Sequence, residues 1–220
     1  MTTVSSGGVG LDPEMNRQVF HSIYEIYTTE CQYARDMACV VQIYLARSSA
    51  SGLSIKQLTV LFASINDILN ISLSFVAVLE NMVPMPILAG WKHTSKAPSL
   101  TCVTFIGDAM LKILEPETYG VYEHYIQNHP RQMRICRGLS SDPRTRVGRW
   151  LYESEQRARD HTSAASLEAL LSEPVHRLGG YLLHMRAILA MIPNDHADFQ
   201  SVLKAHNRVT HYIECINKRV

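Results

Sequence analysis

Apolar residues recur at steps of three and four along most of this chain, and they never alternate in steps of two over a strand-length stretch. The first stripe consists of Val19, Ile23, Ile26, Tyr27, Tyr33, Met37, Val40, Val41 and Tyr44. This spacing places side chains on one face of an α-helix, so the stripe predicts an amphipathic helix over residues 13–47. A chain with this pattern and without strand signals folds by packing helices on helices.

The same spacing predicts further helices over residues 54–83, 100–136, 147–160, 167–191 and 195–220. The third of these is interrupted at Pro116. Turn-forming residues gather in the connections at 48–52, 83–99, 137–146 and 192–195. About six helices with short connections predict an all-α elongated bundle. Residues 1–12 are small and polar with three glycines, so we expect a flexible tail before one domain over residues 13–220.

The charge balance excludes recognition of a partner by a field of the whole molecule. Lys plus Arg is 21 and Asp plus Glu is 20, so the formal net charge is +1 and we expect no nucleic-acid partner. There is no uninterrupted apolar run of membrane-spanning length, and the start MTTVSSGGVG has neither the basic nor the apolar region of a secretory signal. These features predict a cytoplasmic protein without a transmembrane segment.

The local charge is less even than the total. Between residues 131 and 160 every basic residue is an arginine, and the eight are Arg131, Arg134, Arg137, Arg144, Arg146, Arg149, Arg157 and Arg159. Two interpretations remain open for this block. It is either a solvated face beside a connection or a contact site for an acidic partner or phosphoinositide headgroups, which would recruit the protein peripherally to a membrane.

Neither a metal site nor a covalent mechanism is predicted. His124 and His129 are five residues apart, as are His206 and His211, whereas two ligands on one helical face need a spacing of three or four. The five cysteines never form a CxxC pair, which argues against structural zinc. Phosphate-binding loops and nucleophile motifs are also missing, so we expect no cofactor.

Polar residues placed against the helical stripes are the candidates for function. Glu25 lies at the centre of the polar face of the first helix, whereas Glu30 falls within its apolar stripe and is interpreted as a tie between helices, because a buried carboxylate needs a partner. One face of the helix over 167–191 carries Ser172, Glu173, His176, Gly180 and His184. The pair Gly179-Gly180 leaves a shallow spot in mid-helix, which suits close approach by a neighbouring helix or by a partner protein.

Several segments resemble, in the same order, the blocks of the Dbl homology family. VFHSIYEIYTTECQYARDM (19–37) is similar to the first block, LEALLSEPVHRLGGYLLHMRAILAMIP (167–193) to the third, and LKAHNRVTHYIECIN (203–217) to the closing helix. The resemblance extends over residues 17–217. It implies an elongated helical bundle that promotes guanine-nucleotide exchange on a Rho-family small GTPase without covalent chemistry. It also implies a pleckstrin homology domain as a neighbour, because in this family one usually follows the last helix.

The resemblance assigns roles by position. Glu25 matches the glutamate that hydrogen-bonds the first switch segment of the GTPase, and Asn217 matches the asparagine that contacts the second, so both are expected to drive exchange. The expected GTPase-binding residues are Thr29, Ser172, Glu173, His176, Arg177, Gly180 and His184.

Three positions depart from the family pattern. His176 stands where the family usually has Gln, Gly180 where it has Lys or Arg, and Leu182 where it has Pro. The missing cation at Gly180 leaves open an alternative function, that of a catalytically weak or inactive module that binds a GTPase.

Overall fold

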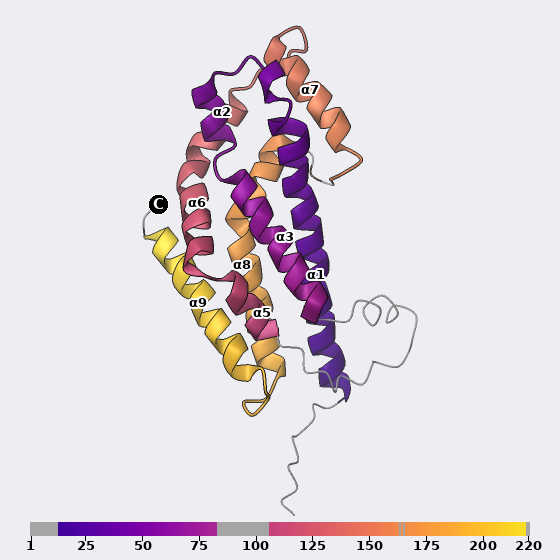
Figure 1. Cartoon of the computed structure of the whole chain (residues 1–220), viewed down its shortest axis with the longest axis vertical. Coiled ribbons are helices and arrows are strands. Elements are labelled where there is room, and N and C mark those ends of the chain that lie inside the picture. The colour runs from indigo at the N-terminus through magenta and orange to yellow at the C-terminus, as the bar shows by residue number, and fades with distance from the viewer. Residues whose placement is uncertain (1–12, 83–105, 163, 165, 219–220) are drawn as a thin grey trace, which may run out of the picture.

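The computed structural model of the chain describes residues 13–82, 106–162, 164 and 166–218. Within them it is an elongated bundle of helices with no strand, which confirms the predicted fold class (Figure 1). The helices are α1 (Pro13–Cys39), α2 (Ile55–Leu61), α3 (Ile65–Met82), α5 (Ile106–Ile113), α6 (Pro116–Arg137), α7 (Arg146–Ala158), α8 (Leu167–Met191) and α9 (Phe199–Asn217). The predicted tail over 1–12 and the connection over 83–99 lie outside the described residues.

The first predicted helix has close to its predicted length but changes its winding. The α-helical part ends at Cys39, and a π-helix continues the same rod over Val40–Leu45. Val40 and Tyr44 remain buried along this part. The apolar stripe therefore stays on the core side through the change in hydrogen-bond register.

The prediction of one continuous helix over residues 54–83 is wrong, because the chain turns at residues 62–64 and forms two helices, α2 and α3. Ser64 adopts a left-handed conformation with φ of 58°. Two amides of α6 satisfy carbonyls near the break: Asn128 donates to the Val60 carbonyl over 2.8 Å and Gln132 to the Leu61 carbonyl over 3.3 Å. The break costs little because side chains distant in sequence replace the helical hydrogen bonds.

The stretch Ile55–Asn81 is long enough to span a membrane and contains an 18-residue window with a mean hydropathy of 1.6. Length and composition do not distinguish such a span from a core helix. In the structure the break at 62–64 divides the stretch, and Ile68, Phe75 and Leu79 on α3 are buried in the bundle. Core packing therefore accounts for part of its apolar character.

Two core clusters follow one another along the bundle, and α8 contributes to both. The first includes Ile23 of α1, Phe75 of α3, Met110 of α5, Met185 of α8 and Val209 of α9. The second includes Met37 of α1, Leu61 of α2, Tyr125 of α6, Trp150 of α7 and Leu170 of α8. Because α8 is anchored at both ends, the side chains on its outer face are held at fixed positions.

A close contact with α5 holds the start of α9. A Cβ atom on Gly107 would lie 2.4 Å from the Val202 backbone nitrogen, so only glycine fits there. Asp198, buried at the start of α9, accepts a hydrogen bond of 3.0 Å from the Gly107 amide. Burial raises the pKa of Asp198 to about 7. This contact fixes the position of α9, whose last residue is Asn217.

Candidate functional site

The sequence-predicted site residues lie on α1, α8 and α9, and α8 packs between the other two helices (Figure 1). The apolar stripes of these three helices face the core, so the polar residues on their other faces form one outer surface. We call the surface formed by Glu25, His176, Gly180, His184 and Asn217 the α1–α8–α9 surface. Its residues come from α1, near the start of the chain, and from α8 and α9, near its end.

Glu25 of α1 and His184 of α8 lie near each other on this surface. Glu25 is exposed, whereas His184 is half-buried. Burial lowers the pKa of His184, and the nearby Glu25 carboxylate opposes this shift. At neutral pH the pair therefore consists of an exposed carboxylate and an uncharged imidazole, both able to form hydrogen bonds.

His176 and Asn217 lie beside a common hollow of about 210 Å³. Its other lining residues are Ile126, Val175, Leu178, Gly179, Ile213 and Ile216. Both His176 and Asn217 are exposed, so the hollow has an apolar floor with two polar side chains at its edge. This combination suits the side chains of a protein partner.

The glycine pair of α8 opens onto free space. A Cβ atom at Gly179 or Gly180 would meet nothing within 4 Å among the atoms that the structure describes. The interpretation that a neighbouring helix approaches this pair closely is therefore wrong. The other interpretation, close approach by a partner protein, stays a prediction.

Leu183 is a surface residue that sequence reasoning missed. Its side chain is 66% exposed, three residues after Gly180 and so on the same side of α8. Leu183 therefore adds apolar area to the outer side of α8, next to the polar residues of the α1–α8–α9 surface. Its position outside the inward stripe of Leu171, Leu178 and Met185 is the sequence signal that identifies it.

Arg177 lies behind the surface, with only 12% of its side chain exposed. Its guanidinium Nε donates to the buried Glu30 carboxylate over 3.0 Å, and it lies over the rings of Tyr33 and Tyr181. Tyr181 donates to the same carboxylate over 2.8 Å, and Ser72 donates to its other oxygen. The prediction that Glu30 ties helices together is thereby confirmed, and Arg177 is its partner.

The other predicted contacts are partly engaged within the bundle. The Thr29 hydroxyl donates to the Ile26 carbonyl over 3.1 Å, and the Ser172 hydroxyl to the Glu168 carbonyl over 2.8 Å. Glu173 is half-buried. Burial raises its pKa to about 8, the negative charge of Asp36 adds to the shift, and Arg177 opposes it. Glu173 is therefore largely uncharged at neutral pH.

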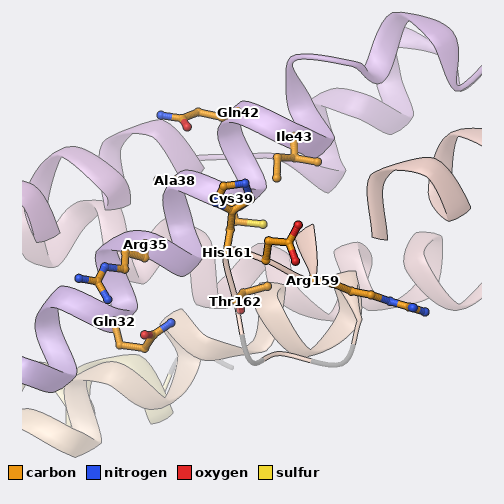
Figure 2. Close-up of a pocket in the computed structure, with 10 residues that line it drawn as sticks. Gln32, Arg35, Ala38, Cys39, Gln42, Ile43, Arg159, His161 and Thr162 are labelled. Carbon is orange, nitrogen blue, oxygen red and sulfur yellow. The ribbon is translucent and has the colours of Figure 1, made fainter. Parts of the chain in front are cut away.

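A further hollow lies away from this surface, between α1 and the segment that follows α7 (Figure 2). Its volume is about 720 Å³, and Arg35, Cys39, Arg159 and His161 are among its lining residues. Figure 2 shows the guanidinium groups of Arg35 and Arg159 directed to opposite sides, away from each other. They do not converge on a common anion, and no sequence-predicted site residue lines this hollow.

No group of three or more His, Cys, Asp or Glu residues is arranged to hold a metal ion within the described part of the chain. The α1–α8–α9 surface instead offers hydrogen-bonding groups, a hollow with an apolar floor and an exposed leucine. Such an arrangement suits binding to another protein.

A sequence model of the RhoGEF domain matches residues 22–217. Rac guanine nucleotide exchange factor JJ of Dictyostelium discoideum is 24% identical over 215 residues, which cover 94% of this chain and 16% of that protein. Pleckstrin homology domain-containing family G member 2 of Homo sapiens is 29% identical over 167 residues, which cover 74% of this chain and 10% of that protein. The chain thus spans a small part of each of these relatives.

Solved structures share the fold. The DH/PH domains of PDZ-RhoGEF, in complex with GTP-gamma-S activated RhoA, superpose with a TM-score of 0.74 at 15% identity. The match covers 97% of this chain and 57% of that one. A structure of the Vav1 exchange factor gives a TM-score of 0.73 at 18% identity, covering 92% of this chain and 49% of that one.

Proposed function

Because the chain belongs to the RhoGEF domain family, we propose that it promotes exchange of GDP for GTP on a Rho-family small GTPase. The observation that carries the proposal is the open α1–α8–α9 surface, which presents Glu25 and Asn217 on either side of an uncovered glycine pair. A relative of similar fold was solved with RhoA, which supports a GTPase of this class as the partner.

The mechanism requires binding energy and no covalent chemistry. In this proposal, Glu25 accepts hydrogen bonds from the first switch segment of the GTPase, and Asn217 contacts the second. A surface that binds the nucleotide-free GTPase more tightly than the loaded one weakens nucleotide binding by the same factor. Each tenfold weakening requires about 1.4 kcal/mol of such preference. The surface serves this purpose because packing at both ends of α8 keeps it rigid.

The proposal is tested by the release of a fluorescent GDP analogue from a panel of Rho-family GTPases. We expect this chain to accelerate release from at least one of them. Glu25→Ala or Asn217→Ala should then slow exchange at least about tenfold, the loss expected for one charge-assisted contact. Both side chains are exposed, so neither variant should unfold the bundle.

Matched controls are Glu117→Ala on α6 and Asn70→Ala on α3, which remove the same side chains from exposed positions outside the surface. Exchange by these controls should equal that of the parent chain. Unchanged exchange by folded Glu25→Ala and Asn217→Ala variants would falsify the assignment of the site.

A second candidate function is binding of a GTPase without exchange. The observation in its favour is that Gly180 carries no cation and that Arg177, one candidate to replace it, is engaged with Glu30. Arg186, another candidate on α8, is exposed. Retained binding to a nucleotide-free GTPase with no acceleration of release would support this candidate. Gly180→Lys has space for its side chain and should raise exchange if the missing cation is the cause.

We also expect a pleckstrin homology domain to accompany this one and a cytoplasmic location for the protein. The solved relatives of this fold include paired DH/PH domains, which supports the first expectation. Fluorescence microscopy of the tagged full-length protein tests the second. Residence inside a membrane-bound compartment would overturn it.

A further inference from the structure

One end of the bundle carries a group of exposed cations outside the α1–α8–α9 surface. They are Lys56 of α2, Arg131 and Arg134 of α6, and Arg146 and Arg149 of α7. We call this group the basic end. In Figure 1 the start of α2, the end of α6 and the start of α7 meet at the same end of the molecule, opposite to the start of α9.

Contacts between these elements hold the cations together. Arg134, at the end of α6, lines a hollow with Gln57 of α2 and Val147 of α7. The side chain of Arg146 passes the connection before α2, with its Cβ 3.5 Å from where a Cβ of Gly52 would lie. Cations from three helices are thus fixed on one rigid end of the molecule.

The charge of the basic end is not balanced by carboxylates. Two further arginines there are paired: Arg137 with Glu168 over 2.8 Å, and Arg144 with Asp142 over 3.2 Å. Among the described residues, no carboxylate lies within ion-pair distance of the five cations of the basic end. These groups are free to meet an anionic partner.

The basic end also exposes apolar surface. Ile55, the first residue of α2, is 83% exposed and has a fixed position, because Ser54 and Gln57 form a capping box around it. The adjoining hollow of about 350 Å³ is lined by Leu53, Gln57, Arg134, Ile135, Gly138, Leu139 and Val147, with no carboxylate among them. The basic end thus combines exposed cations with one exposed isoleucine, which is next to Lys56 in the chain.

We propose that the basic end docks on the surface of a membrane that contains anionic phospholipids. The arginines bind lipid phosphates, for which the planar guanidinium is well suited, and Ile55 enters the interface between headgroups and acyl chains. The cations are spread over three helices around a protruding apolar side chain, which fits a broad charged layer better than a narrow acidic segment. Nucleic acid is disfavoured because the exposed apolar residue is aliphatic and offers no ring for base stacking.

This inference is independent of the proposed exchange function. Glu25 and Asn217 lie on α1 and α9, whereas the basic end is built from α2, α6 and α7. Docking would therefore leave the α1–α8–α9 surface open to a partner at the membrane.

The test is co-sedimentation of the whole chain with vesicles. One set contains phosphatidylcholine alone, and the other contains phosphatidylcholine with phosphatidylserine. We expect binding to the second set only, with a marked decrease at high salt because the attraction is screened. A triple variant, Lys56→Gln/Arg134→Gln/Arg149→Gln, should lower the partition coefficient about 100-fold, at roughly fivefold for each charge.

Ile55→Ser should lower the partition coefficient about tenfold with no change of charge, because it removes the inserted apolar side chain. The matched control, Arg17→Gln/Lys112→Gln/Lys204→Gln, removes the same charge from exposed positions on α1, α5 and α9 and should bind nearly as the parent does. Circular dichroism and exchange in solution check that each variant is folded.

Three outcomes overturn the proposal. The first is equal binding to neutral and anionic vesicles, and the second is an equal loss in the control variant. The third is no vesicle binding while the chain binds an acidic polypeptide such as polyglutamate, which would identify the basic end as a protein contact.

Discussion

Two carboxyl groups at the contact between α1 and α8, Glu30 fully buried and Glu173 half-buried, are kept neutral in different ways. Glu30 of α1 is fully buried and paired with the Arg177 guanidinium, with hydrogen bonds from Tyr181 and Ser72. Glu173, four residues before Arg177 on α8, has the acidic Asp36 as a neighbour instead, and burial raises its pKa to about 8. One site is neutralised by a countercharge and the other by a retained proton.

The difference shows how the contact between α1 and α8 can be strongly stabilised and also depend on pH. A countercharge with full hydrogen bonding stabilises a buried carboxylate at any pH where both groups are ionised. A retained proton stabilises the other carboxyl only until the pH approaches its pKa. Because α8 carries the outer surface, both sites affect how firmly the candidate GTPase-binding residues are held.

The largest effect is expected from Arg177→Met, which leaves the Glu30 carboxylate buried without its countercharge. We expect the free energy of unfolding to fall by about 3–5 kcal/mol, as for other broken buried pairs. Urea unfolding followed by circular dichroism measures this loss.

The matched control is the double variant Glu30→Gln/Arg177→Met, which removes both charges. It should recover more than half of the lost stability, since no isolated charge remains in the core. A loss below about 1 kcal/mol in the single variant would mean that the pair does not hold α1 to α8.

A smaller effect of opposite sign is expected from Glu173→Gln. The pKa of Glu173 is about 8 in the folded chain against an ordinary value of 4.5, so the folded state binds more protons between these values. Its stabilising contribution is complete below the lower value and is lost as the pH rises through about 8. Glutamine keeps the uncharged form, and we expect a gain of about 1–2 kcal/mol at pH 9, discounted for partial exposure, and none near pH 4.

Thermal unfolding across this pH range provides the measurement. Glu214→Gln, which makes the same change at an exposed position of α9, is the matched control. If the gain in stability of Glu173→Gln does not grow with pH, Glu173 does not retain a proton in the folded chain. Glu173 and Glu30 would then not differ in the way described above.

The sequence predicted the helical class and the tie at Glu30, because both follow from local rules: the 3.6-residue period and the need of a buried charge for a partner. It did not predict the break before α3, since no glycine or proline marks it. The carbonyls near the break are satisfied by Asn128 and Gln132, more than sixty residues later. Such compensation depends on tertiary contacts that a local pattern does not contain.

The candidate site shows the same limit. Glu25 and Asn217 were identified by family resemblance, and the structure places both at exposed positions, while their roles stay predictions. The inward direction of Arg177 was missed, because it depends on where α1 brings Glu30. Leu183 was missed because only polar residues outside the inward stripe were considered as contacts, and an exposed leucine was not.

The smallest effect concerns Gly179 and Gly180 on the outer face of α8. Gly179→Ala and Gly180→Ala should each raise the free energy of unfolding by about 0.5–1 kcal/mol, because alanine favours the helix and its methyl group meets no atom within 4 Å. Chemical unfolding detects this gain, and Gly107→Ala is the contrasting case, since its methyl group would collide with α9 and destabilise the chain. If the two α8 variants are more stable but exchange nucleotide more slowly, the glycines serve contact with a partner. In that case the glycines on the outer face of α8 lower the stability of the fold in favour of binding, whereas the pair of Glu30 and Arg177 on the inner face stabilises the fold.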